Sequence, residues 1–267
     1  MSRWGEKMNI SKATAQGQRS YQEDRFVVAN TKDGKLIAVF DGHGGASVST
    51  RLSMALPRIW KKHVAFPMSL SMALENTFKD LNTLTSQMDE GSTASVVFIP
   101  NANNEVHVAI LGDSPVIIQD IHGNLVISPM HNARSNPAEL KAAQARGAFY
   151  SGGYICAHFS GHGIQMTRVF GDRDLSRIVN REPEVYSVPV NDNSFVIVGT
   201  DGLFDPSHQE ITPEIMAVAD LVKAGASAQT VVDRAVAVPT QDNVTAIIVR
   251  FGNKKSRRKK KAKAATA

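Results

Sequence analysis

Short apolar runs rich in valine and isoleucine constrain the fold of this chain more than any other feature of its sequence. Each run has the length and the β-branched composition typical of a strand. Turn-forming segments such as Asp33-Gly34 and His122-Gly123-Asn124 separate several neighbouring runs, and such short connections favour antiparallel pairing. The predicted strands are Arg25–Asn30, Leu36–Phe40, Ala94–Ile99, Val106–Leu111, Val116–Gln119, Phe195–Gly199 and Val244–Phe251.

Helical patterns occur in pairs between the groups of strands. The predicted helices are Ser47–Lys62, Ser69–Met88, Pro213–Lys223 and Ala226–Val236, with a shorter one at Ala138–Arg146. Pro57 predicts a break or kink in the first helix. Thr212 is expected to cap the third helix, with Pro213 at its first position and Gly225 closing its end. The order of these elements predicts a β-sandwich flanked by helices, because strands are followed by two helices, then by strands and again by two helices.

The composition is that of an ordinary soluble globular protein. The 267 residues, 42% hydrophobic and 21% charged, suffice for a sizeable core in one or two domains. No apolar run reaches the roughly 18 residues of a membrane span, and we expect no secretory signal in the first residues. The single cysteine, Cys156, excludes an internal disulfide framework, so we expect an intracellular, cytoplasmic protein.

Charge is distributed unevenly along the chain. The net charge is +5, but residues 254–267 contain eight basic residues and no acidic one, so residues 1–253 carry a net charge of −3. We therefore predict a folded domain over 1–253 and a disordered basic tail over 254–267. The tail could bind an anionic partner such as RNA, a membrane surface or a nuclear import receptor, or it could only aid solubility. Binding to an import receptor would add the nucleus as a location.

Aspartates recur at the ends of the predicted strands, and they are Asp24, Asp41, Asp113, Asp201 and Asp242. If these strand ends converge, partly desolvated carboxylates repel one another unless a cation neutralises them. Hard oxygen ligands without cysteine indicate Mg²⁺ or Mn²⁺ rather than Zn²⁺. The alternative is that each aspartate only caps a turn, which is less expected for five such positions than for one.

The glycine-rich segment Asp41-Gly42-His43-Gly44-Gly45 allows close approach of the backbone to a metal or phosphate. It is not a dinucleotide-binding fingerprint, because Ser47 occupies the place of the last glycine. The sequence also contains no P-loop and no HExxH zinc motif.

Seven segments, taken in order, resemble the metal-dependent serine/threonine protein phosphatases of type 2C. Asp41–Gly45 is similar to the family's Asp-Gly-His-Gly-Gly signature. The other six are Gly17–Asp24, Gly91–Ala94, Leu111–Ser114, Thr167–Asp172, Thr200–Asp205 and Gln241–Thr245. The resemblance implies an α+β fold, a four-layer αββα sandwich in which two mainly antiparallel sheets pack face to face between helix pairs. It also makes residues 1–253 a phosphatase catalytic domain.

The resemblance implies two Mg²⁺ or Mn²⁺ ions and a weaker third site. Asp41 would bridge the two ions, and the Gly42 carbonyl would bind one of them. The other implied ligands are Asp201 and Asp242 at the first ion, Asp24 and Glu23 through water molecules, and Asp113 and Asp205 with Asp201 at the third ion.

The resemblance also implies the chemistry. Arg19 would grip the phosphate of a phosphoserine or phosphothreonine protein substrate, and His43 would be the general acid for the leaving alkoxide. A water activated between the two ions would attack phosphorus in line, without a phosphoenzyme. Asp172 is expected to be structural. We expect a monomer.

The sequence departs from the family pattern in a few places. Pro115 stands where the family has Arg, Met130–Ala133 where it has Asp-His-Lys-Pro, and Ala142 where an Arg follows Glu139. None of these is an expected metal ligand. Tyr150–Gly163 falls where the family has its variable flap, which we expect to be mobile and to face the substrate.

Three other functions compete with this interpretation. A cysteine-based phosphatase is rejected, because His162 rather than Arg stands six positions after Cys156. An inactive relative that binds phosphoproteins is disfavoured, because all the implied ligands are present. A metal-dependent hydrolase of nucleotides or nucleic acid, aided by the basic tail, would be distinguished by its activity on those substrates rather than on a phosphopeptide.

Overall fold

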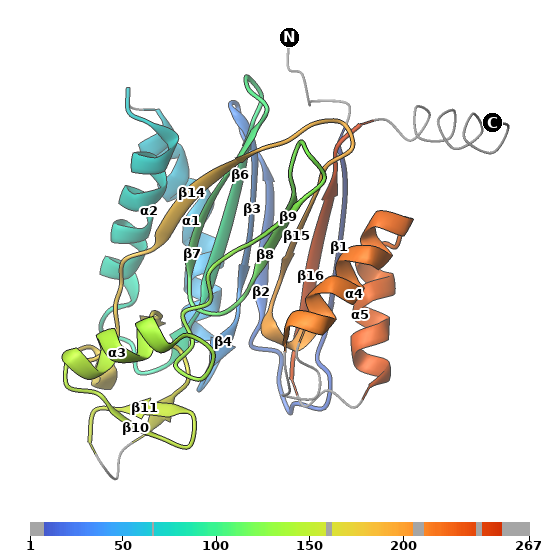
Figure 1. Ribbon diagram of the computed structural model, residues 1–267. Coiled ribbons are helices and arrows are strands. Elements are labelled where there is room, and N and C mark those ends of the chain that lie inside the picture. The colour runs from blue at the N-terminus through green and yellow to red at the C-terminus, as the bar shows by residue number, and fades with distance from the viewer. Residues whose placement is uncertain (1–7, 66, 159–161, 205–210, 239–241, 253–267) are drawn as a thin grey trace, which may run out of the picture.

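The protein is a layered α+β sandwich with helix pairs on its two outer faces (Figure 1). The computed structural model describes residues 8–65, 67–158, 162–204, 211–238 and 242–252. Helices α1 (Ser47–Val64) and α2 (Leu70–Thr85) cover one face, and α4 (Ile211–Ala224) and α5 (Ala228–Ala237) cover the other. Within this part of the chain, every helix is too short or too polar to cross a membrane.

Two five-stranded sheets form the middle layers, and neighbouring strands in both are antiparallel. The sheet beside α1 and α2 has, in order, β14 (Glu184–Pro189), β7 (Glu105–Leu111), β6 (Ala94–Pro100), β3 (Gly34–Phe40) and β2 (Arg25–Asn30). The sheet beside α4 and α5 has β1 (Asn9–Ala15), β16 (Val244–Arg250), β15 (Phe195–Gly199), β8 (Val116–Gln119) and β9 (Leu125–Ile127).

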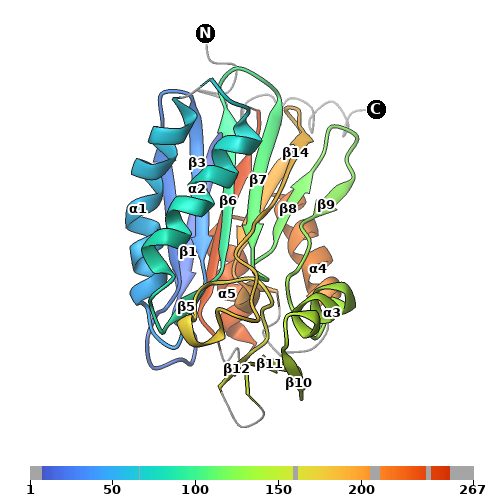
Figure 2. The same ribbon diagram turned by 90° about the vertical axis from the view of Figure 1, so that its left-hand side faces the viewer.

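Smaller elements gather at one end of the sandwich (Figure 2). A three-stranded sheet has the order β13 (Phe170–Gly171), β5 (Gly91–Ser92), β4 (Gly42–His43). A second small sheet has β10 (Phe149–Ser151), β11 (Tyr154–Cys156) and β12 (Gly163–Ile164), near α3 (Pro137–Ala145). Short 3₁₀ helices occupy Arg173–Leu175 and Asp201–Leu203.

Three apolar layers form the core of the sandwich, and a smaller buried cluster lies beside α3. Valine and isoleucine side chains from both sheets, among them Val39, Val108 and Ile247, fill the space between the sheets. Larger side chains pack between each sheet and its helices; Trp60 of α1, for example, lies over Phe98 of β6 with ring centroids 4.6 Å apart. Because β6 is apolar on both faces, all seven of its residues are buried.

The predicted sandwich is confirmed, and the seven predicted strands agree with the structure to within two residues at each end. Helix α1 continues through Pro57 to Val64, so a break, one of the two outcomes predicted at Pro57, does not occur. Another local prediction is wrong. Helix α4 begins at Ile211, so Thr212 lies inside the first turn rather than before it. The predicted basic tail, 254–267, lies outside the described residues.

Candidate functional site

The candidate site is a cleft at the end of the sandwich where strands of both large sheets meet. Its volume is about 1150 Å³, and its lining includes Asp41, Asp113, Asp201 and Asp242. Asp41 and Asp113 follow β3 and β7 of one sheet, whereas Asp201 and Asp242 adjoin β15 and β16 of the other. The fold thus brings carboxylates from four strand ends, distant in the sequence, around one space.

Thr93 ties together the two loops that carry Asp41 and Asp113. Its Oγ1 accepts a hydrogen bond from Asp41 N at 3.2 Å, and its own N–H donates to Asp41 O at 2.9 Å. The same Oγ1 lies 2.7 Å from Ser114 Oγ, next to Asp113. These buried contacts set the spacing between the two strand ends before any ligand binds.

Gly42 lies on β4 where the backbone passes very close to its neighbours. A Cβ at this position would lie 2.7 Å from Glu23 O and 2.9 Å from Ser49 Oγ, so a larger residue does not fit. Glu23 is buried behind Gly42, where its N–H donates to Asn243 Oδ1 at 2.8 Å and its carbonyl accepts from Ser49 Oγ at 2.6 Å. The backbone of the predicted outer ligand Glu23 is therefore held firmly.

The carboxylates around the cleft destabilise one another's charged forms. Burial and the nearby Asp201 raise the pKa of Asp41 well above its ordinary value. Burial, followed by the charges of Asp113 and Asp242, raises the pKa of Asp201 in the same way. Burial also raises the pKa of Asp113. Such a group of acids is costly to keep ionised without a positive partner.

Asp24 is buried at the base of this acidic group. Burial raises the pKa of Asp24 to about 7, although hydrogen bonds from Thr245 and Thr200 lower it. Both of those hydroxyls donate to Oδ2, Thr245 at 2.7 Å and Thr200 at 3.0 Å. Among the described residues Oδ1 has no hydrogen-bond partner, although it is buried. That oxygen is available to accept from a water molecule or another ligand.

The donor atoms of these residues suit a divalent cation, although their side chains do not form a preformed ligand set. In the described part of the chain, no group of three or more His, Cys, Asp or Glu side chains is arranged to hold a metal ion. The donors are carboxylate oxygens and the Gly42 backbone, the ligands that Mg²⁺ and Mn²⁺ prefer. A cation among them would relieve the repulsion between Asp41 and Asp201 and meet the unpartnered oxygen of Asp24.

Arg19 places a positive charge at the rim of the cleft. Its Nη2 lies 3.0 Å from Asp242 Oδ2, and the side chain is 45% exposed. A guanidinium has several N–H donors, so Arg19 can contact Asp242 and a phosphate together. The structure thus places the predicted phosphate-binding residue beside the carboxylate group.

His43 also lines the cleft, and its ring nitrogen Nε2 lies 2.8 Å from Asp172 Oδ2. Sequence reasoning treated Asp172 as structural and missed this contact. The signal available in the sequence was only its place at the end of the Thr167–Asp172 segment, which does not say what its side chain touches.

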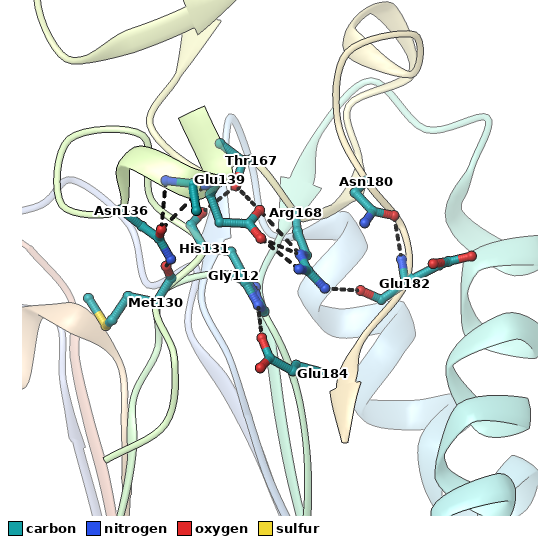
Figure 3. Close-up of polar contacts among 11 residues, drawn as sticks. Gly112, Met130, His131, Asn136, Glu139, Thr167, Arg168, Asn180, Glu182 and Glu184 are labelled. Carbon is teal, nitrogen blue, oxygen red and sulfur yellow. Dashed lines mark hydrogen bonds and ion pairs between the residues drawn. The ribbon is translucent and has the colours of Figure 1, made fainter. Parts of the chain in front are cut away.

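The segment that departs from the family pattern lies directly behind Asp113. Asn132 Nδ2 donates to Asp113 Oδ2 at 2.7 Å. The neighbouring His131 is fully buried; its Nδ1 accepts from Gly112 N at 3.0 Å, and its Nε2 lies 3.2 Å from Glu184. Figure 3 shows the contacts of His131 with Gly112 and Glu184 beside the Glu139–Arg168 pair. The departures therefore concern the support of Asp113 rather than the ligands themselves.

Two predicted features, the ligand Asp205 and the flap, lie wholly or partly outside the described residues. Asp205, an implied ligand of the third ion, lies outside the described residues. The predicted flap, Tyr150–Gly163, supplies Tyr154, His162 and Gly163 to the lining of the cleft. Its described part forms β10 to β12, so the segment does border the site.

Comparison with known proteins defines first the fold and then the family. A solved structure titled as a Caenorhabditis elegans sex-determining protein superposes with a TM-score of 0.79 at 23% identity, covering 94% of this chain and 66% of that chain. A serine-threonine phosphatase 2C from Toxoplasma gondii superposes with a TM-score of 0.73 at 21% identity, covering 92% and 95%. At these identities the likeness shows the αββα sandwich, and the predicted fold class is thereby confirmed.

The family follows from the sequence matches. The family model for protein phosphatase 2C matches residues 3–244. The chain therefore belongs to the protein phosphatase 2C family, as its motifs predicted.

Curated relatives are considerably longer than this chain. Probable protein phosphatase 2C 52 of Oryza sativa subsp. japonica is 28% identical over 250 residues, which cover 90% of this chain and 50% of that protein. Protein phosphatase 1K, mitochondrial, of Xenopus laevis is 30% identical over 268 residues, covering 92% and 69%. The chain thus spans about half of the first relative and about two thirds of the second.

Proposed function

We propose that this chain is a metal-dependent protein phosphatase that hydrolyses phosphoserine and phosphothreonine side chains of proteins. The observation that carries the proposal is the group of mutually destabilised carboxylates, Asp41, Asp113 and Asp201, in a cleft that Arg19 and His43 also line. Membership of the protein phosphatase 2C family supports the same activity.

Divalent cations would be held by the residues that line the acidic side of the cleft. Asp41, the Gly42 carbonyl, Asp201 and Asp242 would be direct ligands, and Asp24 and Glu23 would act through water. A phosphatase of this fold, titled as the catalytic domain of PstP in complex with two manganese ions, supports two Mg²⁺ or Mn²⁺ ions. When bound, such ions lower the pKa of water and neutralise charge on a phosphoryl group.

The side chains at the rim would bind and turn over the substrate. Arg19 would bind the phosphate oxygens through paired N–H donors while it keeps its contact with Asp242. His43 would give a proton to the serine or threonine oxygen as the P–O bond breaks, because an alkoxide is a poor leaving group. The rest of catalysis would come from stabilisation of the charge that develops on the phosphoryl group in the transition state.

The shape of the cleft favours a side chain on a protein over a free nucleotide. Its outer wall is formed by the segment that precedes α3 and by the β11–β12 region, including Arg134, Tyr154 and Gln165. Such a broad, open wall can accept a phosphorylated segment of another protein. We propose that the chain acts as a monomer.

The deciding experiment is phosphate release from a phosphothreonine peptide by the full chain, with Mn²⁺, with Mg²⁺ and with EDTA. Metal-dependent release that is absent in Asp41→Asn supports the proposal. The same preparation is offered an oligonucleotide and a nucleoside triphosphate. Preference for either of those would make the chain a nucleotide or nucleic-acid hydrolase. No turnover by folded protein, with retained binding of the phosphopeptide, would make it an inactive binding protein.

A further inference from the structure

Arg134 places a second positive charge at the cleft, in addition to that of Arg19. Of the described residues that line the cleft, these two alone carry a permanent positive charge. Arg19 contacts Asp242, which adjoins β16, whereas Arg134 lies just before α3, on the wall that leads to the flap. The two cations therefore come from different parts of the fold, and a role for Arg19 does not account for Arg134.

The backbone on both sides of Arg134 is held in place. Arg134 N donates to Asn132 Oδ1 at 2.9 Å, and Ala133 N donates to Gln165 O at 2.8 Å. Two residues further on, the side chain of Asn136 caps the N-terminus of α3. The position of the Arg134 backbone is thus fixed by the fold before a substrate binds.

The aliphatic part of the Arg134 side chain lies across the hairpin of β10 and β11, which is close to α3 (Figure 2). A Cβ at Gly153 would lie 2.7 Å from Arg134 Cδ and 2.9 Å from Arg134 Cγ. Gly153 has a φ of 96°, so the turn needs glycine, and the arginine stem occupies the space above it. The stem is therefore packed while the charged end stays at the surface.

The guanidinium of Arg134 is oriented, but most of its donors are unused. Its Nη1 lies 3.5 Å from Gln165 Oε1, which is a long hydrogen bond. Gln165 is itself oriented, because its Nε2 lies 3.4 Å from the hydroxyl of Tyr154. Among the described residues, no carboxylate forms an ion pair with Arg134. Since a guanidinium has five N–H donors in a planar fork, Arg134 can bind a further acceptor through two of them.

The charge of the remaining lining determines which acceptor needs this arginine. Asp41, Asp113, Asp201 and Asp242 give the cleft a negative charge, which repels any anionic group on a substrate. An anionic group beside the substrate's phosphate therefore needs a local cation, and on the flap side of the cleft Arg134 supplies it. A neutral or basic flanking group would leave the guanidinium without an acceptor.

We propose that Arg134 is a specificity-determining residue that binds an acidic group of the protein substrate next to its phosphorylated residue. That group is the carboxylate of a glutamate or aspartate, or a second phosphate, since paired N–H donors bind either. The proposal rests on the proposed phosphatase function, because the phosphorylated residue has to occupy the acidic part of the cleft. A contact to a flanking group supports binding rather than the chemical step, so it acts mainly on KM.

The test uses phosphothreonine peptides that differ only in the residues on both sides of the phosphothreonine. These residues are glutamate, alanine, lysine or a phosphonate analogue of phosphoserine that cannot be hydrolysed. With Mn²⁺ we expect kcat/KM of the wild type to be roughly 3- to 10-fold higher for the glutamate peptide than for the alanine peptide, mostly through KM. The glutamate or the phosphonate peptide, whichever has the higher kcat/KM, identifies the source of the acidic group. Salt should reduce the preference.

Variants of Arg134 separate its charge from its packing. Arg134→Met keeps an aliphatic stem over Gly153 but removes the guanidinium, and should bring the ratio of glutamate to alanine peptide to about one. Arg134→Glu should reverse the preference toward the lysine peptide. Arg58→Met, at an exposed position of α1, should keep the wild-type ratio. A wild-type ratio in Arg134→Met would mean that the arginine only packs on the hairpin. An equal loss on all peptides would place it at the reacting phosphate. Either result would overturn the proposal.

A binding measurement distinguishes failure of this proposal from failure of the phosphatase proposal. Equal kcat/KM of the wild type for all the peptides would leave the phosphatase standing and overturn the role of Arg134. If the folded wild type releases phosphate from none of them, the phosphatase proposal fails, and fluorescence anisotropy of the labelled peptides decides the role of Arg134. Tighter binding of the glutamate peptide that is lost in Arg134→Met would support that role, and equal binding of the glutamate and alanine peptides would overturn it.

Discussion

Asn132 Nδ2 donates a 2.7 Å hydrogen bond to Asp113 Oδ2, across 19 residues of sequence. In the family pattern a lysine occupies the position of Asn132. A neutral amide satisfies the carboxylate without adding a charge, so Asp113 keeps its negative charge for another partner. Burial nevertheless raises the pKa of Asp113, and the Asn132 bond is the largest of the effects that oppose this increase.

Asn132→Ala should weaken divalent-metal binding at the Asp113 side of the cleft. Without the amide, the pKa of Asp113 should rise further, so a proton competes better with the metal for the carboxylate. We expect roughly tenfold weaker binding of the weakest Mn²⁺ ion near pH 7, measured by calorimetric titration. Asn193→Ala, at an exposed turn, is the control. Unchanged Mn²⁺ binding in Asn132→Ala would show that the bond to Asp113 has no bearing on metal.

Asp41→Asn should abolish metal-dependent turnover while it stabilises the metal-free fold. Asp41 lies where burial and Asp201 disfavour its charge, and an amide removes that repulsion. In EDTA near pH 7.5 we expect the melting temperature of the variant to exceed that of the wild type by a few degrees. With Mn²⁺ the order should reverse, because the wild type binds the ion. A variant that melts below the wild type in EDTA would contradict the repulsion on which this prediction rests.

The stability of the metal-free protein should fall as the pH rises, in part through Asp24. Its pKa is raised from an ordinary value near 3.8 to about 7 by burial. The folded state therefore holds the proton more tightly than the unfolded state, and this contribution is full below pH 4 and lost by about pH 7. Thermal melting in EDTA at pH 4.5 and 7.5 measures it. Relative to the wild type, Asp24→Asn should gain stability between these two values, and exposed Asp174→Asn should not.

The strands that sequence reasoning found are those with apolar side chains on both faces. β6 and β16 are almost wholly buried, and each is an apolar run with a single small hydroxyl residue near its start, Ser95 and Thr245. β1 and β14 were missed, because each is an edge strand with exposed polar positions and so lacks that pattern. Two-residue strands such as β4 and β5 have no periodicity from which they could be predicted.

The residues of the site also divide into those that the sequence predicted and those that it could not. The aspartates at strand ends were predictable, because an acidic residue directly after an apolar run is visible in the sequence itself. The contact of His43 with Asp172 joins positions 129 residues apart and depends on the register of β4, β5 and β13 over Gly91. A pattern within one segment cannot show such a register.

The Glu139–Arg168 pair behind the site should contribute substantially to stability. Arg168 Nη2 donates to Glu139 Oε1 at 2.6 Å, and Thr167 Oγ1 donates to Oε2 at 2.7 Å (Figure 3). Burial alone would raise the pKa of Glu139, but these hydrogen bonds lower it below its ordinary value. The ionised carboxylate thus stabilises the fold above its unfolded pKa, and this contribution is lost as the pH falls through the lowered folded value.

Arg168→Ala leaves that buried carboxylate without its main partner. We expect the free energy of unfolding to fall by roughly 2–3 kcal/mol near pH 7, or the melting temperature by roughly 5–10 °C, measured by thermal melting. The deficit should shrink toward pH 4, where Glu139 becomes protonated in the variant. Lys62→Ala removes an ion pair to Asp80 of similar length, 2.8 Å, but with a lysine that is 60% exposed, and should cost less than about 1 kcal/mol. Equal losses in the two variants would mean that burial of the Glu139–Arg168 pair adds nothing to its strength.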